Sequence, residues 1–276
     1  MIMNSSFQNI LFHNFPSKYL LLKSEVKKFN TIYNGNTIIQ NNIFQVMDNY
    51  CKKNNRILNI IKLPTSDDKL TSFSCIRNGE IFIVMNSMQP QSNLILAGAH
   101  ELFHILCYIT VKNNYLLLNG SLITTSILED VLVDTQQMSA NEFARLLLVS
   151  PTSLLEQIEV YGIDKNNITT LDCLKLMDIF AVPYRTIIIR LFEESIVSEY
   201  KAKKLLNTDQ DKIDTIIDNI TISHKWNKHN QDLINLCGLE DLLLTNSLNK
   251  ALPESRINGD LEFVHQTFDR VNNLVE

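Results

Sequence analysis

The sequence predicts an α+β protein in which a small antiparallel β-sheet is followed by a mainly helical chain. Seven glycines and six prolines in 276 residues are too few for a turn-rich β-sandwich. Apolar residues recur at helical spacing over most of the chain. The segment Arg77-Asn78-Gly79 separates two apolar runs, which is typical of a β-hairpin because Asn and Gly both tolerate positive φ.

The first hundred residues are expected to form a helix and a short meander. Residues 1–30 have no clear period and predict an arm or a short helix. From about Thr37 to Tyr50 the apolar positions follow a helical period, and Lys52 and Lys53 follow as they would at a helix C-terminus. The aliphatic run 57–63 predicts a strand, and the runs 70–76 and 80–85 predict the two arms of the hairpin.

Beyond Asn86 every element that the pattern predicts is a helix. Ser92 or Asn93 could cap a helix over residues 94–109. After residue 205 the chain becomes more polar, and its helical fragments are shorter. The remaining predicted helices cover residues 126–149, 171–180, 184–192, 211–222, 232–244 and 260–275.

Composition excludes several function classes. The net charge is −5, from 25 basic and 30 acidic residues, so we expect no global electrostatic attraction to nucleic acid or to anionic lipid. Five dispersed cysteines without CxxC spacing are typical of a reducing compartment. No apolar run reaches the length of about 18–20 residues that a membrane span needs. The sequence therefore predicts a soluble cytoplasmic protein without a membrane partner.

One motif carries chemistry: His100-Glu101-Leu102-Phe103-His104, an HExxH. Residues four apart share a helical face, so His100 and His104 can bind one Zn²⁺ together. Glu101 lies beside the metal rather than on it, where it can accept a proton from the activated water. The competing interpretation is a polar cluster whose groups satisfy one another inside a buried helix, since apolar residues surround the motif on most sides.

Four ordered segments resemble the ImmA/IrrE-type metallopeptidases. They are "LTSFSCIRNGEIFIVMNS", the HExxH, "SANEFARLLLVSP" with its Ala140-Asn141 pair, and "LMDIFAVPYRTIIIRLFEESIVS". The resemblance implies a zincin-like catalytic domain over residues 35–204, with a helix-turn-helix-like segment at 171–192. Residues 1–34 would form an N-terminal arm, and residues 205–276 a helical C-terminal region.

The third metal ligand departs from the family pattern. The family has a glutamate three residues before the Ala-Asn pair, and this chain has Gln137 there. An amide oxygen can bind zinc but is neutral, so it should hold the metal less firmly than a carboxylate. Asp134, three residues earlier on the same helical face, is the alternative ligand. Glu142 lies about 140° round the helix from Gln137 and fits less well.

The resemblance implies a zinc-dependent endopeptidase that cleaves a helix-turn-helix transcriptional repressor, with Glu101 as general base. The alternative, supported by Gln137 alone, is a weakly active or inactive regulatory protein with the same fold. Direct DNA binding by residues 171–192 is disfavoured, because the second helix carries only Arg185 and Arg190 among apolar residues. The pair His224 and His229 predicts a surface cluster, and Cys107 a core position.

Overall fold

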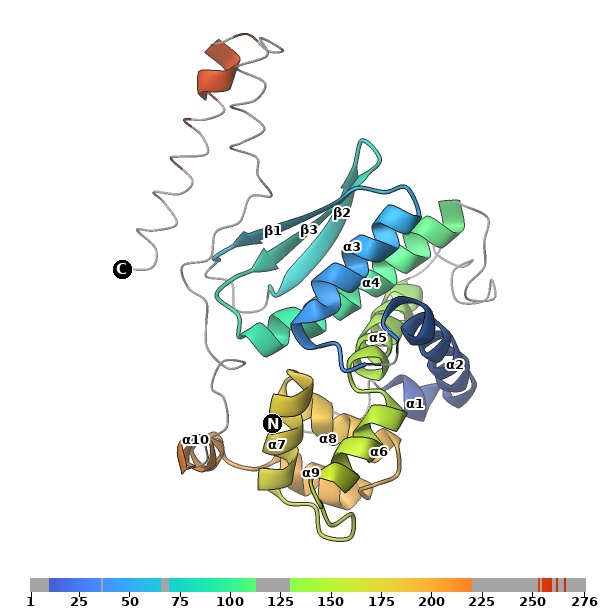
Figure 1. Ribbon diagram of the computed structural model, residues 1–276, viewed down its shortest axis with the longest axis vertical. Helices are drawn as coiled ribbons and strands as arrows, with labels where there is room; N and C mark the ends of the chain where they lie inside the picture. Colours follow the sequence, from blue (N-terminus) through green and yellow to red (C-terminus); the bar gives the residue numbers. More distant parts are fainter. Residues whose placement is uncertain are drawn as a thin grey trace.

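The computed structural model describes residues 10–35, 37–65, 70–112, 130–219, 253, 255–259, 262 and 266. Within them the protein is mixed α+β, as predicted (Figure 1). A three-stranded sheet with two covering helices forms one part, and a group of short helices forms the other. The helix α5 (Asp130–Leu148) connects the two parts.

Between residues 10 and 33 the chain forms two helices that pack into the core. The helix α1 (Leu11–Asn14) leads through Phe15 into α2 (Pro16–Tyr33), which begins with proline at its first position. Proline is favoured there because its missing N–H would have no partner in the helix. One face of α2 contacts α5 and buries Tyr19, Leu22, Val26 and Phe29.

The helix α3 (Ile43–Lys53) begins later than the apolar pattern suggests, after a short 3₁₀ turn at Gln40–Asn42. The strands follow as β1 (Leu58–Leu63), β2 (Ser72–Arg77) and β3 (Glu80–Asn86). Asn78 and Gly79 connect β2 to β3 with φ of 53° and 85°, which confirms the predicted hairpin turn.

The sheet is mixed, so the expectation of an antiparallel sheet is wrong for one of its two strand pairs. The strand order is β1-β3-β2, with β3 in the centre. β2 pairs with β3 antiparallel, whereas β1 pairs with β3 parallel, from Leu58 opposite Ile81 to Leu63 opposite Asn86. Strand direction depends on the path between β1 and β2, which the local apolar pattern does not encode.

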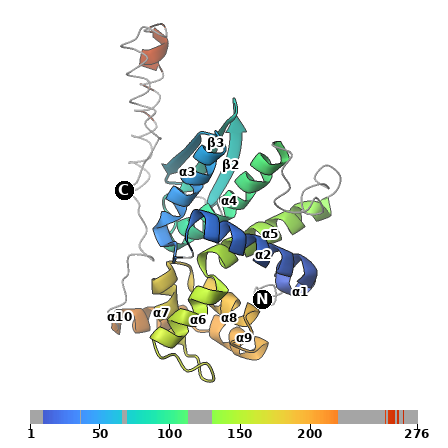
Figure 2. The same ribbon diagram turned by 45° about the vertical axis from the view of Figure 1, so that its right-hand side comes forward.

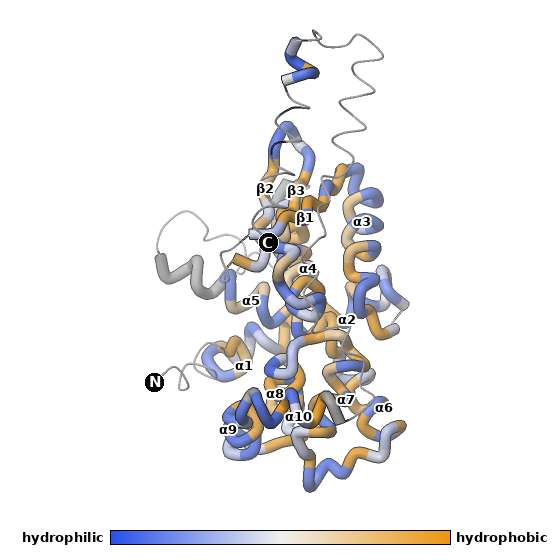
Figure 3. The backbone as a smooth tube through the Cα atoms, turned by 90° about the vertical axis from the view of Figure 1, so that its left-hand side faces the viewer, coloured by the Kyte–Doolittle hydropathy of each residue, from blue (hydrophilic) through white to orange (hydrophobic). Residues whose placement is uncertain are grey.

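The helix α4 (Gln91–Lys112) lies beside α3 and packs against the sheet (Figure 2). Its residues Gln91–Ile109 are long and apolar enough to cross a membrane by length and composition, but 72% of that window is buried within the protein. Apolar colour covers much of α4 in Figure 3. The helix is therefore central to the core, as its nearly all-round apolar sequence predicts.

The helices α6 (Pro151–Val160), α7 (Thr170–Phe180), α8 (Tyr184–Glu193), α9 (Glu199–Leu206) and α10 (Gln210–Asn219) form the second part. Thr169 and Asp172 form a capping box at α7, and Ser150 caps α6. In α8, Ile187, Ile188 and Leu191 are buried while Arg185 is exposed. This burial confirms that α8 packs in the core. Some predictions fall outside the described residues: the helix at 232–244 and the pair His224 and His229. The predicted helix at 260–275 has only residues 262 and 266 described.

A buried ionic cluster joins α2, α5 and α8. Arg190 of α8 is fully buried, and it donates to the Val149 carbonyl, to Glu193 at 2.7 Å and to Glu194 at 2.7 Å. Arg145 of α5 pairs with Glu142 at 2.6 Å and lies 3.3 Å from Glu193. The cluster ends on α2, where Tyr19 and Lys23 contact Glu194. A buried charge needs such partners, and the sequence pattern did not reveal them.

Candidate metal centre

The structure brings the two motif histidines together on one face of α4. Their Nε2 atoms are 3.2 Å apart. Two Zn–N bonds of about 2.0–2.1 Å at a tetrahedral angle place the nitrogens about 3.3–3.4 Å apart. The separation therefore fits a shared zinc ion. It also fits a single hydrogen bond between two neutral rings, which is the polar-cluster interpretation of the motif.

A second contact fixes the ring of His100. Its Nδ1 lies 2.9 Å from Oδ1 of Asn141, which belongs to α5. Facing an oxygen acceptor, Nδ1 carries the proton, so the lone pair of His100 lies on Nε2. That tautomer is the one that binds a metal through Nε2, and a hydrogen bond to the other ring nitrogen is the usual way of holding it.

The environment of His104 also favours the neutral ring. Burial lowers the pKa of His104, the nearby His100 lowers it further, and the Glu101 carboxylate partly opposes both. A lower pKa keeps His104 unprotonated at neutral pH. Because only an unprotonated ring nitrogen can bind a metal, this shift prepares the pair for a cation.

Glu101 is positioned from the sheet. The residue is buried, with 4% of its surface exposed, and its Oε1 accepts a hydrogen bond of 2.8 Å from Ser72 Oγ. Ser72 is the first residue of β2 and pairs with Met85 of β3. The sheet thus holds one carboxylate oxygen in place next to the histidine pair.

The third ligand is the least defined part of the centre. Gln137 is exposed on α5, four residues before Asn141 and therefore on the same helical face. Asp134 lies in α5 one turn earlier, and its side chain is outside the described residues. Within the part of the chain that the structure describes, no group of three or more His, Cys, Asp or Glu side chains gathers as a metal site would. Position 137 is an amide and therefore is not one of these four residue types.

Two other sequence expectations can be placed. Glu142 is fully buried and bonded to Arg145, so it belongs to the ionic cluster rather than to the histidine pair. Cys107 is buried as expected, and burial raises the pKa of its thiol to about 12, which leaves it inert at neutral pH.

The sequence did not predict two contacts of the centre: that of Ser72 with Glu101 and that of Asn141 with His100. Asn141 lies within the segment "SANEFARLLLVSP", but the sequence alone does not indicate which side chain it contacts. Ser72 carries no sequence signal, because its contact with Glu101 spans 29 residues and depends on the sheet.

Comparison with known proteins adds nothing to this geometry: no family model, curated protein or solved structure matches the chain.

Proposed function

We propose that this protein is a zinc-dependent endopeptidase of the ImmA/IrrE type. The observation that carries the proposal is the pair of Nε2 atoms, 3.2 Å apart, with the Glu101 carboxylate held beside them by Ser72. A hydrogen-bonded polar cluster needs no buried glutamate at that position, whereas hydrolysis needs a base there.

In this proposal each residue has one role. His100 and His104 hold the zinc ion, and Gln137 completes the set, with Asp134 as the alternative third ligand. A zinc ion in this position would act as a Lewis acid, which polarises a carbonyl and makes bound water more acidic. Glu101 accepts the proton from water, and Ser72 keeps its carboxylate oriented. Asn141 keeps the ring of His100 in the metal-binding tautomer.

The position of β2 supports a peptide substrate. Among the described residues β2 is an edge strand, it contacts α4, and it carries Ser72 next to Glu101. An extended peptide can add to such an edge through backbone hydrogen bonds. A peptide bound there would lie along the strand whose Ser72 holds the proposed base, Glu101.

The substrate that we propose is a helix-turn-helix transcriptional repressor, in a mobile-element or stress response, within the cytoplasm. The resemblance of the four sequence segments supports this choice. The N-terminal helices α1 and α2 pack into the core of this chain. We therefore propose that the repressor is a separate chain and that this protein does not itself bind nucleic acid.

The decisive experiment measures zinc and hydrolysis separately. The full chain is loaded with zinc and incubated with a library of internally quenched peptides and with a purified helix-turn-helix repressor. We expect one zinc per chain in wild type and in Glu101→Gln, and cleavage that Glu101→Gln reduces about 10²–10⁴-fold. Glu159→Gln, at an exposed position of α6, is the matched control and should cleave normally. Zinc-free protein, or equal cleavage by Glu101→Gln, would refute the proposal.

One observation favours a second function, a regulatory protein with the same fold and little peptidase activity. The residue expected to be the third ligand is a neutral and exposed amide, Gln137. A weak third ligand lowers zinc affinity without changing the fold. Zinc binding without measurable cleavage, in wild type and in Gln137→Glu alike, would select this function.

A further inference from the structure

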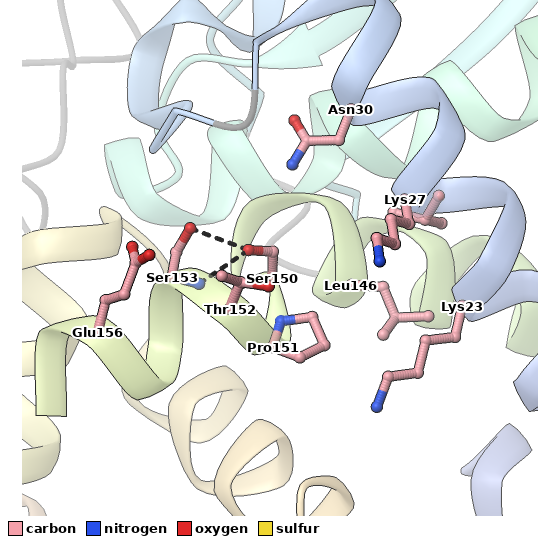
Figure 4. A pocket seen from close by; sticks show the side chains of 10 residues that line it. Lys23, Lys27, Asn30, Leu146, Ser150, Pro151, Thr152, Ser153 and Glu156 are labelled. Carbon is pink, nitrogen blue, oxygen red and sulfur yellow. Dashed lines mark hydrogen bonds between the residues drawn. The ribbon is translucent and has the colours of Figure 1, made fainter.

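A cavity separate from the histidine pair lies between α2 and the start of α6. Its volume is about 310 Å³, at the lower end of the range for small-molecule sites. Lys23, Val26, Lys27 and Asn30 line it from α2, and Leu146 lines it from the end of α5. Its remaining lining is Ser150, Pro151, Thr152, Ser153 and Glu156 (Figure 4).

The first turn of α6 faces this cavity with its donors. The N-terminus of a helix carries partial positive charge and backbone N–H groups without helical partners. Pro151 has no N–H, Ser153 N donates to the capping Ser150 Oγ, and Leu154 N donates to the Ser150 carbonyl. The N–H of Thr152 is left for a ligand. An anion is the ligand that such a terminus favours.

Asn30 is the independent observation that points to a ligand. Only 4% of its surface is exposed, and its Oδ1 accepts from Asn34 Nδ2 at 2.9 Å. Asn34 Nδ2 also donates to the Thr37 carbonyl, which fixes the amide of Asn34 and therefore turns Nδ2 of Asn30 the other way. Among the described residues this nitrogen has no acceptor, and Figure 4 shows it pointing into the cavity. The amide of Asn30 is therefore available as a donor to a ligand in the cavity.

The charges around the cavity favour an anion as well. Lys27 has no carboxylate partner among the described residues, and Figure 4 shows its ammonium group near the cavity. Lys23 is already paired with Glu194 at 2.7 Å. Glu156 opposes an anion, but it is exposed and lies in the second turn of α6. Lys27 therefore supplies the charge, with Thr152 N–H and Asn30 Nδ2 as the neutral donors.

The cavity also has an apolar wall, formed by Val26, Leu146 and Pro151. We propose that this cavity binds a small phosphate monoester: its phosphoryl group contacts Lys27, Asn30 and the N-terminus of α6, and its organic part packs against the apolar wall. Phosphate oxygens match the donors that converge there. The site is independent of the proposed metal centre.

Isothermal titration calorimetry of the full chain tests the proposal, with phenyl phosphate as the probe and inorganic phosphate as the comparison. EDTA is present throughout, so that phosphate bound to zinc does not contribute. We expect saturable 1:1 binding of phenyl phosphate, at least fivefold tighter than inorganic phosphate. Lys27→Met should weaken binding tenfold or more, and Glu156→Gln should strengthen it two- to threefold.

Lys28→Met is the matched control, because Lys28 follows Lys27 on α2, is exposed, pairs with Glu25 and does not line the cavity. It removes the same charge and should bind like wild type. Melting temperatures without ligand verify that the variants fold. Three results would overturn the proposal: no binding of phenyl phosphate, equal losses in Lys27→Met and Lys28→Met, or equal affinity for inorganic phosphate.

Discussion

At the scale of single residues, the ability of the proposed metal centre to bind zinc depends on which ring nitrogen of His100 carries the proton. The Nδ1 of His100 faces Asn141 Oδ1 at 2.9 Å, which places the lone pair on the nitrogen that faces His104. Without Asn141 the ring can rotate and exchange tautomers. Metal affinity should therefore depend on a residue that does not bind the metal.

We expect Asn141→Ala to weaken zinc binding about 10–100-fold, the usual effect of losing a residue that orients a metal ligand. Competition with a chelator of known affinity measures the change. Asn167→Ala, at an exposed position in the turn before α7, is the control and should bind as wild type does. Equal affinities for Asn141→Ala and wild type would show that Asn141 does not orient the ring.

Gln137→Glu should strengthen zinc binding about tenfold or more, because it replaces a neutral amide oxygen, a weak ligand, with a negatively charged carboxylate oxygen. The same chelator competition measures it. Asp134→Asn in the wild-type background separates the two candidates for the third ligand. If Gln137→Glu changes nothing and Asp134→Asn weakens binding, Asp134 is the ligand.

The residues of this centre differ in how far the sequence reveals them. His100, Glu101 and His104 follow from the four-residue repeat of one helical face, which is local information. Ser72 and the contact of Asn141 come from other elements, 29 and 41 residues away. Their positions depend on how β2 and α5 pack against α4, and no spacing rule within one element contains that.

At the scale of elements, the end of α8 shows local strain. Ser195 follows this helix with φ of 58°, in the left-handed region, and the N–H of Ile196 reaches back to the Leu191 carbonyl. Such a reversal favours glycine, because a side chain there costs about 1–2 kcal/mol. Ser195 is exposed, so its side chain contributes no core contact.

Ser195→Gly should therefore raise the free energy of unfolding by about 0.5–1 kcal/mol, after the greater freedom of glycine in the unfolded chain is subtracted. Urea unfolding followed by circular dichroism measures the difference. Ser198→Gly is the comparison, since Ser198 caps α9 from an extended conformation; it should be neutral or slightly destabilising. A destabilised Ser195→Gly would mean that no strain is stored at that turn.

Among the described residues, most helices and all three strands could be predicted from the sequence, because their periods are local. The helix over α4 was predicted within three residues at each end, and the Asn78-Gly79 turn was predicted with its positive φ. The parallel pairing of β1 with β3 was not predicted. The size of α2 was missed as well, since its apolar residues are mixed with lysines and show little periodicity.

At the scale of the whole molecule, the ionic cluster connects the two parts of the fold. Arg190 donates to the Val149 carbonyl just after α5, to Tyr19 of α2, and to the two glutamates at the end of α8. In Glu194, burial opposes ionisation, but Arg190 and Lys23 outweigh it and lower the pKa of the carboxyl. Arg190 and Lys23 thus hold Glu194 in its charged state.

Arg190→Ala should lower the free energy of unfolding by about 3–5 kcal/mol, because it leaves buried carboxylates without their partner. Arg185→Ala removes the same charge from an exposed position of the same helix and should change stability by less than about 0.5 kcal/mol. Guanidinium unfolding of both variants measures the contrast. Similar losses of unfolding free energy in the two variants would mean that the buried cluster does not stabilise the fold more than an exposed charge does.

The cluster also predicts a pH dependence. Burial raises the pKa of Glu142 from 4.5 to about 7, against the lowering effect of Arg145. The folded state then binds a proton that the unfolded state releases, so this group's contribution to stability is lost as pH rises from about 4.5 through about 7. Arg145 and Arg190 lower this pKa and the nearby Glu193 raises it, so all three neighbours influence how Glu142 titrates.

Glu142→Gln should remove that pH dependence. Between pH 5 and pH 8, wild type should lose about 1–3 kcal/mol relative to the variant in urea unfolding. Glu159→Gln, exposed on α6, serves as the control and should follow the wild-type profile. Parallel profiles for wild type and Glu142→Gln would contradict the assignment.

The strand order has a consequence for synthesis on the ribosome. The central strand β3 is the last of the three in the chain, so β1 and β2 emerge before the strand that both pair with. Neither can form its native ladder until residue 86 has left the exit tunnel. The β2–β3 hairpin closes over two residues and should form first, and β1 should join afterwards across a longer loop. During that interval the apolar strand Leu58–Leu63 is unpaired, and the nascent chain is most prone to aggregate there.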